Sequence, residues 1–264
     1  MGAAGEAFPG WAATTAGQRA ALVHAIADGI EQRTEELAQV ETLDNGALLR
    51  SHRRSVMPRV ARNFRFFAGW LGELDDGGME IAGHREQVCW HPAGFTAVLT
   101  PWNEPLMLVT WRIAPALAAE NTVVATPPEW APLTASLLAD ITCHSGLPDG
   151  VFNVVQGLGS EAGAALAGHP DVARVAFAGS AATGRAVAVA AGAKLTPVSL
   201  DLGGKSPLRA GTVWVSCFVV RDLRAPFGGA GQSGIGRASG TWSVDFSSDV
   251  KNTVFAPGEW QTGG

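Results

Sequence analysis

The amino-acid sequence predicts an α/β fold, in which helices cover both faces of a parallel sheet and a small β arm is attached. Between residues 95 and 202, five short apolar runs alternate with four stretches of helical periodicity. This alternation is typical of repeated β-α-β units. The composition is that of a globular protein, with 47% hydrophobic and 16% charged residues. A chain of 264 residues is also long enough to bury a large core.

The first seventy residues favour two helices. Apolar residues recur at helical spacing over 21–30 and predict the first helix. Thr14 or Thr15 is available as its N-cap, and Asn45-Gly46 ends this region. A second apolar stripe over 56–71 predicts the other helix, which a glycine-containing turn closes.

The second helix is rich in arginine, and no acidic residue lies between Asp44 and Glu73. The arginines are Arg50, Arg53, Arg54, Arg59, Arg62 and Arg65. One interpretation is a nucleic-acid surface, and the other is a solvated helix face or a subunit contact. We favour the second, because no aromatic residues interleave with the arginines and the net charge of −5 argues against a nucleic-acid partner.

The remaining elements follow in order from residue 79. A β-hairpin or arm is expected over 79–90. Strands are expected at 95–99, 122–126, 151–155, 172–177 and 197–202, and helices at 106–120, 132–144, 160–167 and 181–193. The alternation stops at Lys205, after which come the strand-like run GTVWVSCFVV and a glycine-rich loop. Residues 242–255 alternate like one more exposed strand, with Trp242, Val244 and Phe246 on one side.

Cysteine and histidine spacing predicts no metal site. Cys89, Cys143 and Cys217 form no CxxC pair, so each is expected to be a packing thiol. The six histidines are expected on the surface or in loops. The start of the chain has no secretory pattern, and no apolar run reaches the ~18 residues of a membrane helix. We therefore expect a cytoplasmic protein with no membrane partner.

Two glycine patterns resemble nucleotide fingerprints. Residues 229–234 match GxGxxG, but no β-α-β crossover follows them. Residues 204–206 resemble the end of a P-loop, but Ser199 occupies the position of the required glycine. We reject both.

Six ordered segments identify a stronger resemblance. They are LTPWNEPLML, NTVVATPPEWAPLTA, GLPDGVFNVVQGLGSEAGAAL, VAFAGSAATG, LDLGGKSP and PFGGAGQSGIGR. Together they resemble the NAD(P)-dependent aldehyde dehydrogenase superfamily, and the run GTVWVSCFVVRDLRAPFGG is most similar to members that act on semialdehydes. The resemblance covers nearly the whole chain and implies a Rossmann-like cofactor-binding fold.

The resemblance also implies how the chain is divided into domains and segments. Residues 1–78 would be N-terminal helices packed on the cofactor domain, and 95–205 the dinucleotide-binding domain. Residues 79–94 and 242–256 would form the oligomerisation arm and tail strand. Residues 206–241 would be a remnant strand and glycine-rich loop after a deleted catalytic domain.

The resemblance implies a cofactor cleft and assigns a role to individual residues of this sequence. Glu129 would bond the adenine ribose hydroxyls, and Gly179-Ser180 would meet the pyrophosphate at a helix N-terminus, which favours anions. Gly159 and Gly163 would let the adenine approach a helix. The full set is Thr100, Pro101, Trp102, Thr126, Glu129, Gly159, Gly163, Phe177, Gly179, Ser180, Thr183, Leu202 and Gly203. The expected cofactor is NAD, because Glu129 would repel a 2′-phosphate.

The implied chemistry is incomplete. Asn103 holds the position of the aldehyde-polarising asparagine, and Asp201 that of the general base, one methylene shorter than the family glutamate. The family's nucleophilic cysteine is absent, since LDLGGKSP is followed directly by LRAGTVWV. Thr126 replaces a ribose-binding lysine, a loss of roughly 1.5–3 kcal/mol. Binding of NAD is therefore expected to be weak or lost.

Three functions follow from this resemblance. The chain could be a shortened homologue that binds a dinucleotide but does not oxidise aldehydes. It could be a non-catalytic subunit or regulator, associating with itself or with a full-length relative. It could also be a repurposed non-redox enzyme, with Asn103 and Asp201 anchoring an apolar metabolite in the cleft.

Overall fold

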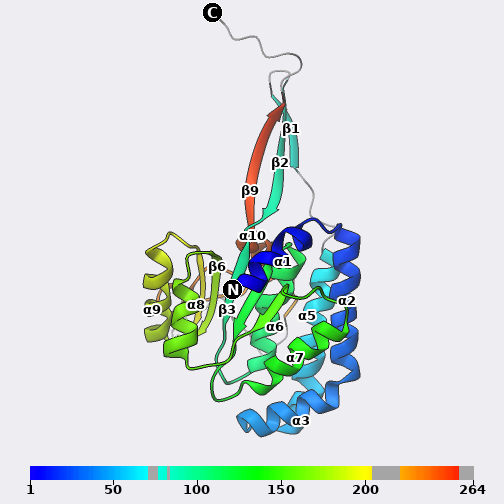
Figure 1. Ribbon diagram of the computed structural model, residues 1–264, viewed down its shortest axis with the longest axis vertical. Coiled ribbons are helices and arrows are strands. Elements are labelled where there is room, and N and C mark those ends of the chain that lie inside the picture. Colours follow the sequence, from blue (N-terminus) through cyan, green and yellow to red (C-terminus); the bar gives the residue numbers. More distant parts are fainter. Residues whose placement is uncertain (71–76, 82–83, 204–220, 256–264) are drawn as a thin grey trace, which may run out of the picture.

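The computed structural model describes residues 1–70, 77–81, 84–203 and 221–255. The strand-like run at 211–220, the P-loop-like triplet at 204–206 and Cys217 lie outside the described residues. The predicted fold class is confirmed, because a largely parallel sheet carries helices on both faces (Figure 1).

The main sheet has six strands. In spatial order they are β5 (Phe152–Val154), β4 (Thr122–Thr126), β3 (Phe95–Leu99), β6 (Val172–Gly179), β7 (Val198–Leu202) and β8 (Gly234–Ile235). The first five are parallel, and β8 pairs antiparallel with β7. Every residue of β3 and β4 is buried, as expected for central strands covered on both faces. The predicted bounds of these two strands are exact.

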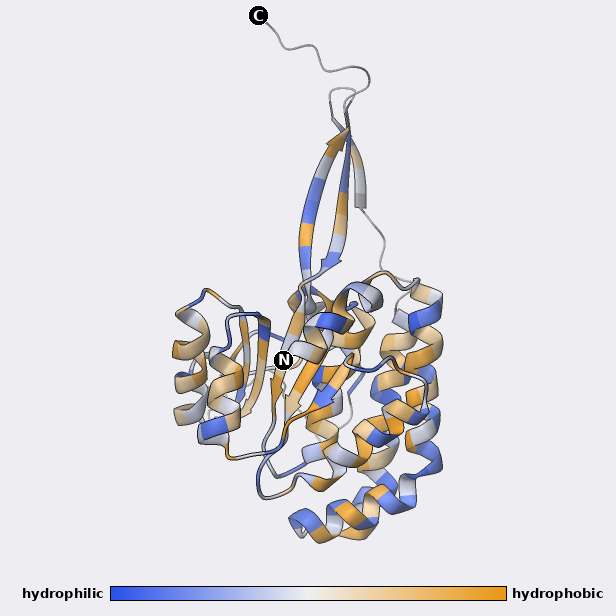
Figure 2. Ribbon diagram, in the orientation of Figure 1, coloured by the Kyte–Doolittle hydropathy of each residue, from blue (hydrophilic) through white to orange (hydrophobic). Residues whose placement is uncertain are grey.

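Helices form layers on the two sides of this sheet. Those of the β-α-β region are α6 (Pro105–Ala118), α7 (Leu133–His144), η2 (Gly159–Gly163), α8 (Ala164–Gly168) and α9 (Ala181–Gly192). Figure 1 shows α8 and α9 on one side and α6 and α7 on the other, with α2 and α5 packed outside the second pair. Figure 2 shows the central strands as hydrophobic, while hydrophilic residues gather on the outer helices.

The N-terminal region differs from the two predicted helices. It forms α1 (Gly2–Ala12), α2 (Ala16–Gln32), α3 (Thr34–Asn45), α4 (Leu49–Ser51), η1 (His52–Val56) and α5 (Met57–Trp70). The predicted N-cap is confirmed at Thr15, which forms a capping box with Gln18. Gly46 ends α3 in the left-handed conformation. Helix α1 was missed because its glycines and Pro9 hide the helical pattern.

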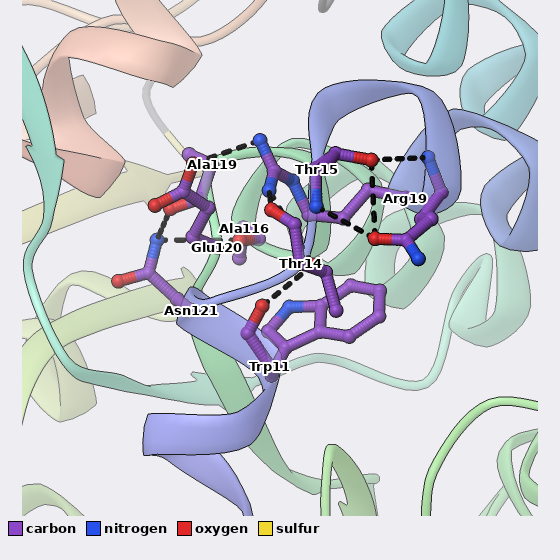
Figure 3. A network of polar contacts seen from close by, with 9 residues as sticks. Trp11, Thr14, Thr15, Arg19, Ala116, Ala119, Glu120 and Asn121 are labelled. Carbon is purple, nitrogen blue, oxygen red and sulfur yellow. Dashed lines mark hydrogen bonds and ion pairs between the residues drawn. The ribbon is translucent and has the colours of Figure 1, made fainter.

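A polar network fixes α2 to the body (Figure 3). Arg19 of α2 forms an ion pair with Glu120, with 2.7 Å between Nη2 and Oε1, and donates to the Thr14 carbonyl. The neighbouring Asn121 is fully buried and donates to the carbonyls of Ala116, Ala119 and Ser247. The network therefore connects α2, the end of α6 and the base of the C-terminal segment.

The predicted arm is a three-stranded antiparallel sheet that projects from the body (Figure 1). Its strands are β1 (Gly77–Ile81), β2 (His84–Pro92) and β9 (Ser248–Phe255). The exposed strand that we predicted over 242–255 is present over Ser248–Phe255. Strand β9 pairs with β2 at eight positions within the same chain, which satisfies its backbone on that side.

The first part of this predicted strand, over 242–247, is wrong, because residues Gly240–Ser247 form helix α10. The alternation of apolar residues there suggested a strand, but Ser243, Val244 and Ser247 are all buried, at the spacing of one helix face. The Ser247 hydroxyl donates to the Ser243 carbonyl at 2.8 Å, and the Ser243 hydroxyl accepts the Ser239 amide at 2.7 Å.

Two side chains lie where we did not expect them. Cys143 is exposed near the end of α7, so it is not a packing thiol. His52 is buried in η1, with neither ring nitrogen hydrogen-bonded, so it is not a surface histidine. Among the described residues, no helix is long and apolar enough to span a membrane.

Candidate functional site

The expected site residues gather where the parallel strands end. Residues 100–104 connect β3 to α6, which begins at Pro105, a residue suited to the first helical turn. The hydroxyls of Thr100 and Thr126 lie at the ends of β3 and β4, are buried, and have no hydrogen-bond partner. Buried polar groups normally have partners. These two hydroxyls are therefore enclosed, unsatisfied groups at the strand ends.

A second group lies at the loop after β4. The Glu129 carboxylate is exposed and accepts a hydrogen bond from the Gly159 amide at 3.1 Å. Gly163 lies beside Leu99, and a Cβ at this glycine would approach the leucine side chain to 3.1 Å. Gly163 thus allows η2 to pack closely against the end of β3, where a larger residue would require the Leu99 side chain to shift.

The third group begins α9. Gly179 has φ +159°, and a Cβ there would lie 2.5 Å from the ring of buried Phe177. Ser180 is the N-cap of α9, where its hydroxyl accepts the Thr183 amide at 3.1 Å. The open amides of this helix start face the same edge of the sheet, so they can bind an anion.

A cavity of about 860 Å³ adjoins these groups. Eight predicted residues line it, namely Pro101, Trp102, Asn103, Gly179, Ser180, Asp201, Leu202 and Gly203. The other predicted residues lie outside its lining, namely Thr100, Thr126, Glu129, Gly159, Gly163, Phe177 and Thr183. The structure thus brings the two expected catalytic positions, Asn103 and Asp201, into one cavity.

Sequence reasoning missed the arginines of this cavity. Arg59 and Arg62 line it from α5, and Arg221 lines it from the segment before β8. The first two belong to the arginine-rich stripe that we assigned to a solvated face or a subunit contact. Other arginines of the stripe do fit a solvated face, since exposed Arg65 pairs with Asp28 and Glu31 of α2. Spacing alone could not separate the two sets.

Arg221 is held between two aromatic rings. Its guanidinium carbon lies 4.3 Å from the ring centroid of Trp111 and 4.7 Å from that of Phe227. Its Nη2 donates to the Ser239 hydroxyl at 2.9 Å, while Nη1 is buried without a partner. Burial and the nearby Arg59 lower the pKa of Arg221 to about 10, although Asp201 opposes this. Arg221 therefore remains cationic at neutral pH and contributes a positive charge to the lining of the cavity.

Two acidic side chains also line the cavity. Burial raises the pKa of Asp201, while Arg112 and Arg221 act in the opposite direction. Burial likewise raises the pKa of Glu104, opposed by Arg59. Asp201 thus has the desolvated surroundings of a proton acceptor.

No cysteine occurs among the described residues that line the cavity. Cys89 lies in the arm strand β2, and Cys143 lies on the surface of α7. Within the described part of the chain, no group of three or more metal-ligating side chains is present. The described site thus has an amide, two carboxyl groups and cationic groups, but no thiol nucleophile among its described residues.

The residues at the strand ends fit a dinucleotide. Two unpartnered hydroxyls, an exposed carboxylate at Glu129 and a helix start at Ser180 follow one edge of the sheet. In open α/β sheets, this edge is the usual place for such a ligand. Thr126 cannot provide a positive charge, so the fit lacks one charge-assisted contact.

Comparisons with known proteins agree with this architecture. A family model described as "Aldehyde dehydrogenase family" matches residues 1–209 and 206–253. The chain is 39% identical over 236 residues to 2-hydroxymuconic semialdehyde dehydrogenase from Pseudomonas sp. (strain CF600), covering 86% of this chain and 48% of that protein. The structure of PnpE from Pseudomonas sp. WBC-3 is 43% identical, with a TM-score of 0.75 over 77% of this chain and 42% of that one.

A structure of PnpE in complex with nicotinamide adenine dinucleotide has the same fold, with a TM-score of 0.94 and 24% identity. That match covers 99% of this chain and 90% of the other. In sequence, the chain spans less than half the length of the curated relatives it matches.

Proposed function

We propose, from the premise that this chain belongs to the aldehyde dehydrogenase family, that it binds NAD weakly and holds a small carboxylate-bearing molecule without oxidising it. NAD would lie along the strand ends, and the other molecule in the adjoining cavity. The central observation is that Asn103, Asp201 and Arg221 line one cavity in which no described residue is a thiol.

The cofactor proposal rests on the residues at the strand ends. Glu129 would accept hydrogen bonds from ribose hydroxyls, and the start of α9 at Ser180 would bind the pyrophosphate. NAD, when bound, supplies a hydride acceptor. We expect a dissociation constant weaker than micromolar, because Thr126 cannot offer a cation.

The ligand proposal rests on the two kinds of cavity wall. Trp102, Trp111 and Phe227 offer apolar surface, while Arg221 offers a positive charge. A molecule with an apolar body and a carboxylate suits both walls, because a carboxylate pairs strongly with a guanidinium. Several relatives are named semialdehyde dehydrogenases, which agrees with a carboxylate-bearing ligand class.

The chemical proposal follows from the remaining groups. The Asn103 amide can donate a hydrogen bond to a carbonyl oxygen, and the Asp201 carboxylate can accept a proton. Covalent aldehyde oxidation needs a thiolate nucleophile in addition. We therefore propose that this cavity binds a carbonyl compound, whose oxygen Asn103 holds by a hydrogen bond and from which the Asp201 carboxylate can accept a proton.

The ligand proposal can be tested with muconate, a stable dicarboxylate with an apolar body, against its dimethyl ester. We expect muconate to bind, and Arg221→Gln to weaken it roughly 10- to 100-fold, through loss of a charged hydrogen bond. The matched control is Arg224→Gln, which changes an exposed arginine paired with Asp222. Equal loss in both variants, or equal binding of the ester, would contradict the proposal.

The redox part of the proposal needs a separate assay. We expect no NAD reduction above background over a panel of semialdehydes. Reduction that disappears in Cys217→Ala would show that this cysteine acts as a nucleophile and would overturn the proposal.

A second candidate function is that of a subunit that assembles with itself or with a longer relative. The projecting arm favours it, because Val250, Val254 and Phe255 of β9 are each about half exposed. The outer edge of β9 also has no strand beside it in the described sheet. We expect sedimentation at micromolar concentration to show an oligomer. A soluble monomer, equally stable when the chain ends at Ser239, would contradict this candidate.

A further inference from the structure

The last two turns of α3 contact both loops of the proposed dinucleotide site. Figure 1 shows α3 at the end of the body opposite the arm. The Asn45 side-chain amide donates to the Asn103 carbonyl at 3.4 Å. The Asp44 carboxylate accepts the amide of Leu133, the first residue of α7, at 2.9 Å. Helix α3 is thus tied to the loops that carry Asn103 and Glu129.

Glu41, one turn earlier, lies in the interior of the same junction. Its side chain is fully buried, and its Oε2 accepts the Thr134 hydroxyl at 2.7 Å, in the first turn of α7. The backbone amide of Leu106, in the first turn of α6, also interacts with this carboxyl group. The Oε1 atom has no hydrogen-bond partner. One carboxyl group therefore contacts the starts of the two helices that follow the cofactor loops.

The charges around Glu41 do not compensate its burial. Within the described residues, no arginine or lysine forms an ion pair with it. Glu104, before α6, and Asp44, on α3 itself, are both acidic and act against its ionisation. Element η1 also packs on α3. It carries His52, which is buried, and Arg53, which is paired with Glu35.

This environment makes the carboxylate costly. Burial, with Glu104 and Asp44, raises the pKa of Glu41 to about 7, although the Thr134 hydroxyl and the Leu106 amide oppose the shift. A neutral residue of the same shape would stabilise the fold better at this position. A buried carboxylate without a cation is thus a poor stabilising element, which suggests that it serves the loops it contacts.

We propose that Glu41 is a positioning residue, which holds the first turns of α6 and α7 so that the Asn103 and Glu129 loops keep the spacing that a dinucleotide requires. This inference rests on the proposed function. Ionised Glu41 accepts from Thr134 through Oε2, and a proton taken up on the unpartnered Oε1 places a buried O–H donor without an acceptor at this junction. Dinucleotide affinity should therefore fall as the pH decreases through neutrality.

The test compares Glu41→Gln with Thr134→Val, which removes the partner hydroxyl and leaves the carboxyl group in place. NAD binding is measured by calorimetry at pH 6 and pH 8. At pH 8 we expect each variant to bind roughly 3- to 10-fold more weakly than the wild type, the loss given by one hydrogen bond of ordinary strength. Wild-type affinity should decrease at pH 6, and that of Glu41→Gln should not change with pH.

A readout without cofactor accompanies the titration. Amide hydrogen exchange at pH 8 should be faster over residues 100–106 and 127–134 in both variants. The control is Glu35→Gln, an exposed residue on the same helix, which should alter neither binding nor exchange in these two stretches.

The outcomes separate this inference from the proposed function. If the wild type does not bind NAD, the proposed function fails, and the exchange experiment still decides the role of Glu41. If NAD binds the variants and the wild type equally, and exchange over the two loops is unchanged, Glu41 does not position them and the inference is overturned.

Discussion

The carboxyl groups of Glu41 and Asp201 are both withdrawn from water, and their surroundings differ. Glu41 lies at the junction of α3, α6 and α7, without a cationic partner. Asp201 lies at the end of β7, in the cavity, with Arg112 and Arg221 nearby. Burial raises both pKa values, but only at Asp201 do positive charges offset part of the cost. The same desolvation thus favours a proton at Glu41 and permits an anion at Asp201.

The largest effect that this comparison predicts is on stability. The pKa of Glu41 is about 7 in the folded chain, against 4.5 as its ordinary value. The unfolded chain therefore releases this proton first, and the folded state loses stability as the pH rises from about 4.5 to 7. We expect Glu41→Gln to raise the free energy of unfolding at pH 8 by about 3 kcal/mol at most, and to change it little below pH 4.5.

Urea denaturation at both pH values measures this difference. An equal gain at low and high pH would show that Glu41 is already ionised at little cost. A loss of stability at pH 8 would show that its hydrogen bonds outweigh its desolvation.

The matched change in the cavity should have a smaller effect. Asp201→Asn also removes a desolvated charge, but it leaves Arg112 and Arg221 without their counter-charge. We therefore expect a gain in the free energy of unfolding at pH 8 that is smaller than the gain from Glu41→Gln. The same urea series measures it. The comparison fails if Asp201→Asn stabilises the chain as much as Glu41→Gln does.

An exposed carboxylate gives the smallest effect on stability. Glu129 is exposed and accepts a hydrogen bond from the Gly159 amide. Glu129→Gln should therefore change the free energy of unfolding by no more than about 0.5 kcal/mol. Its effect should appear in cofactor preference instead, because the charge that repels a 2′-phosphate is removed. We expect the preference for NAD over NADP to decrease by about tenfold or less. Paired titrations of the two cofactors would reveal an unchanged preference, which would contradict this role.

Much of the fold could be predicted because its signals are local. The buried runs of β3 and β4 have no competing periodicity, and the capping residue Thr15 and the helix end at Gly46 lie within a few residues of what they terminate. The resemblance located Asn103 and Asp201 in the same way, through short motifs. The cavity that joins them is the structural result of this predicted topology.

The missed features depend on contacts between distant parts of the chain. Arg221 stacks on Trp111, and Glu41 accepts from Thr134, 93 positions away. Neither pairing has a sequence pattern. Helix α10 was predicted as a strand because its short run of apolar residues is compatible with the two-residue period of a strand and with the 3.6-residue period of a helix. The packing of Val244 into the core decides between the two.

Isothermal calorimetry of the full chain with NAD and NADP decides whether the strand ends bind a dinucleotide. We expect NAD to bind with a dissociation constant weaker than micromolar, and NADP to bind more weakly still. Tight binding would show that a cation at position 126 is not needed, and equal or tighter binding of NADP would contradict the role of Glu129. The absence of binding for both cofactors would refute a dinucleotide site at the strand ends.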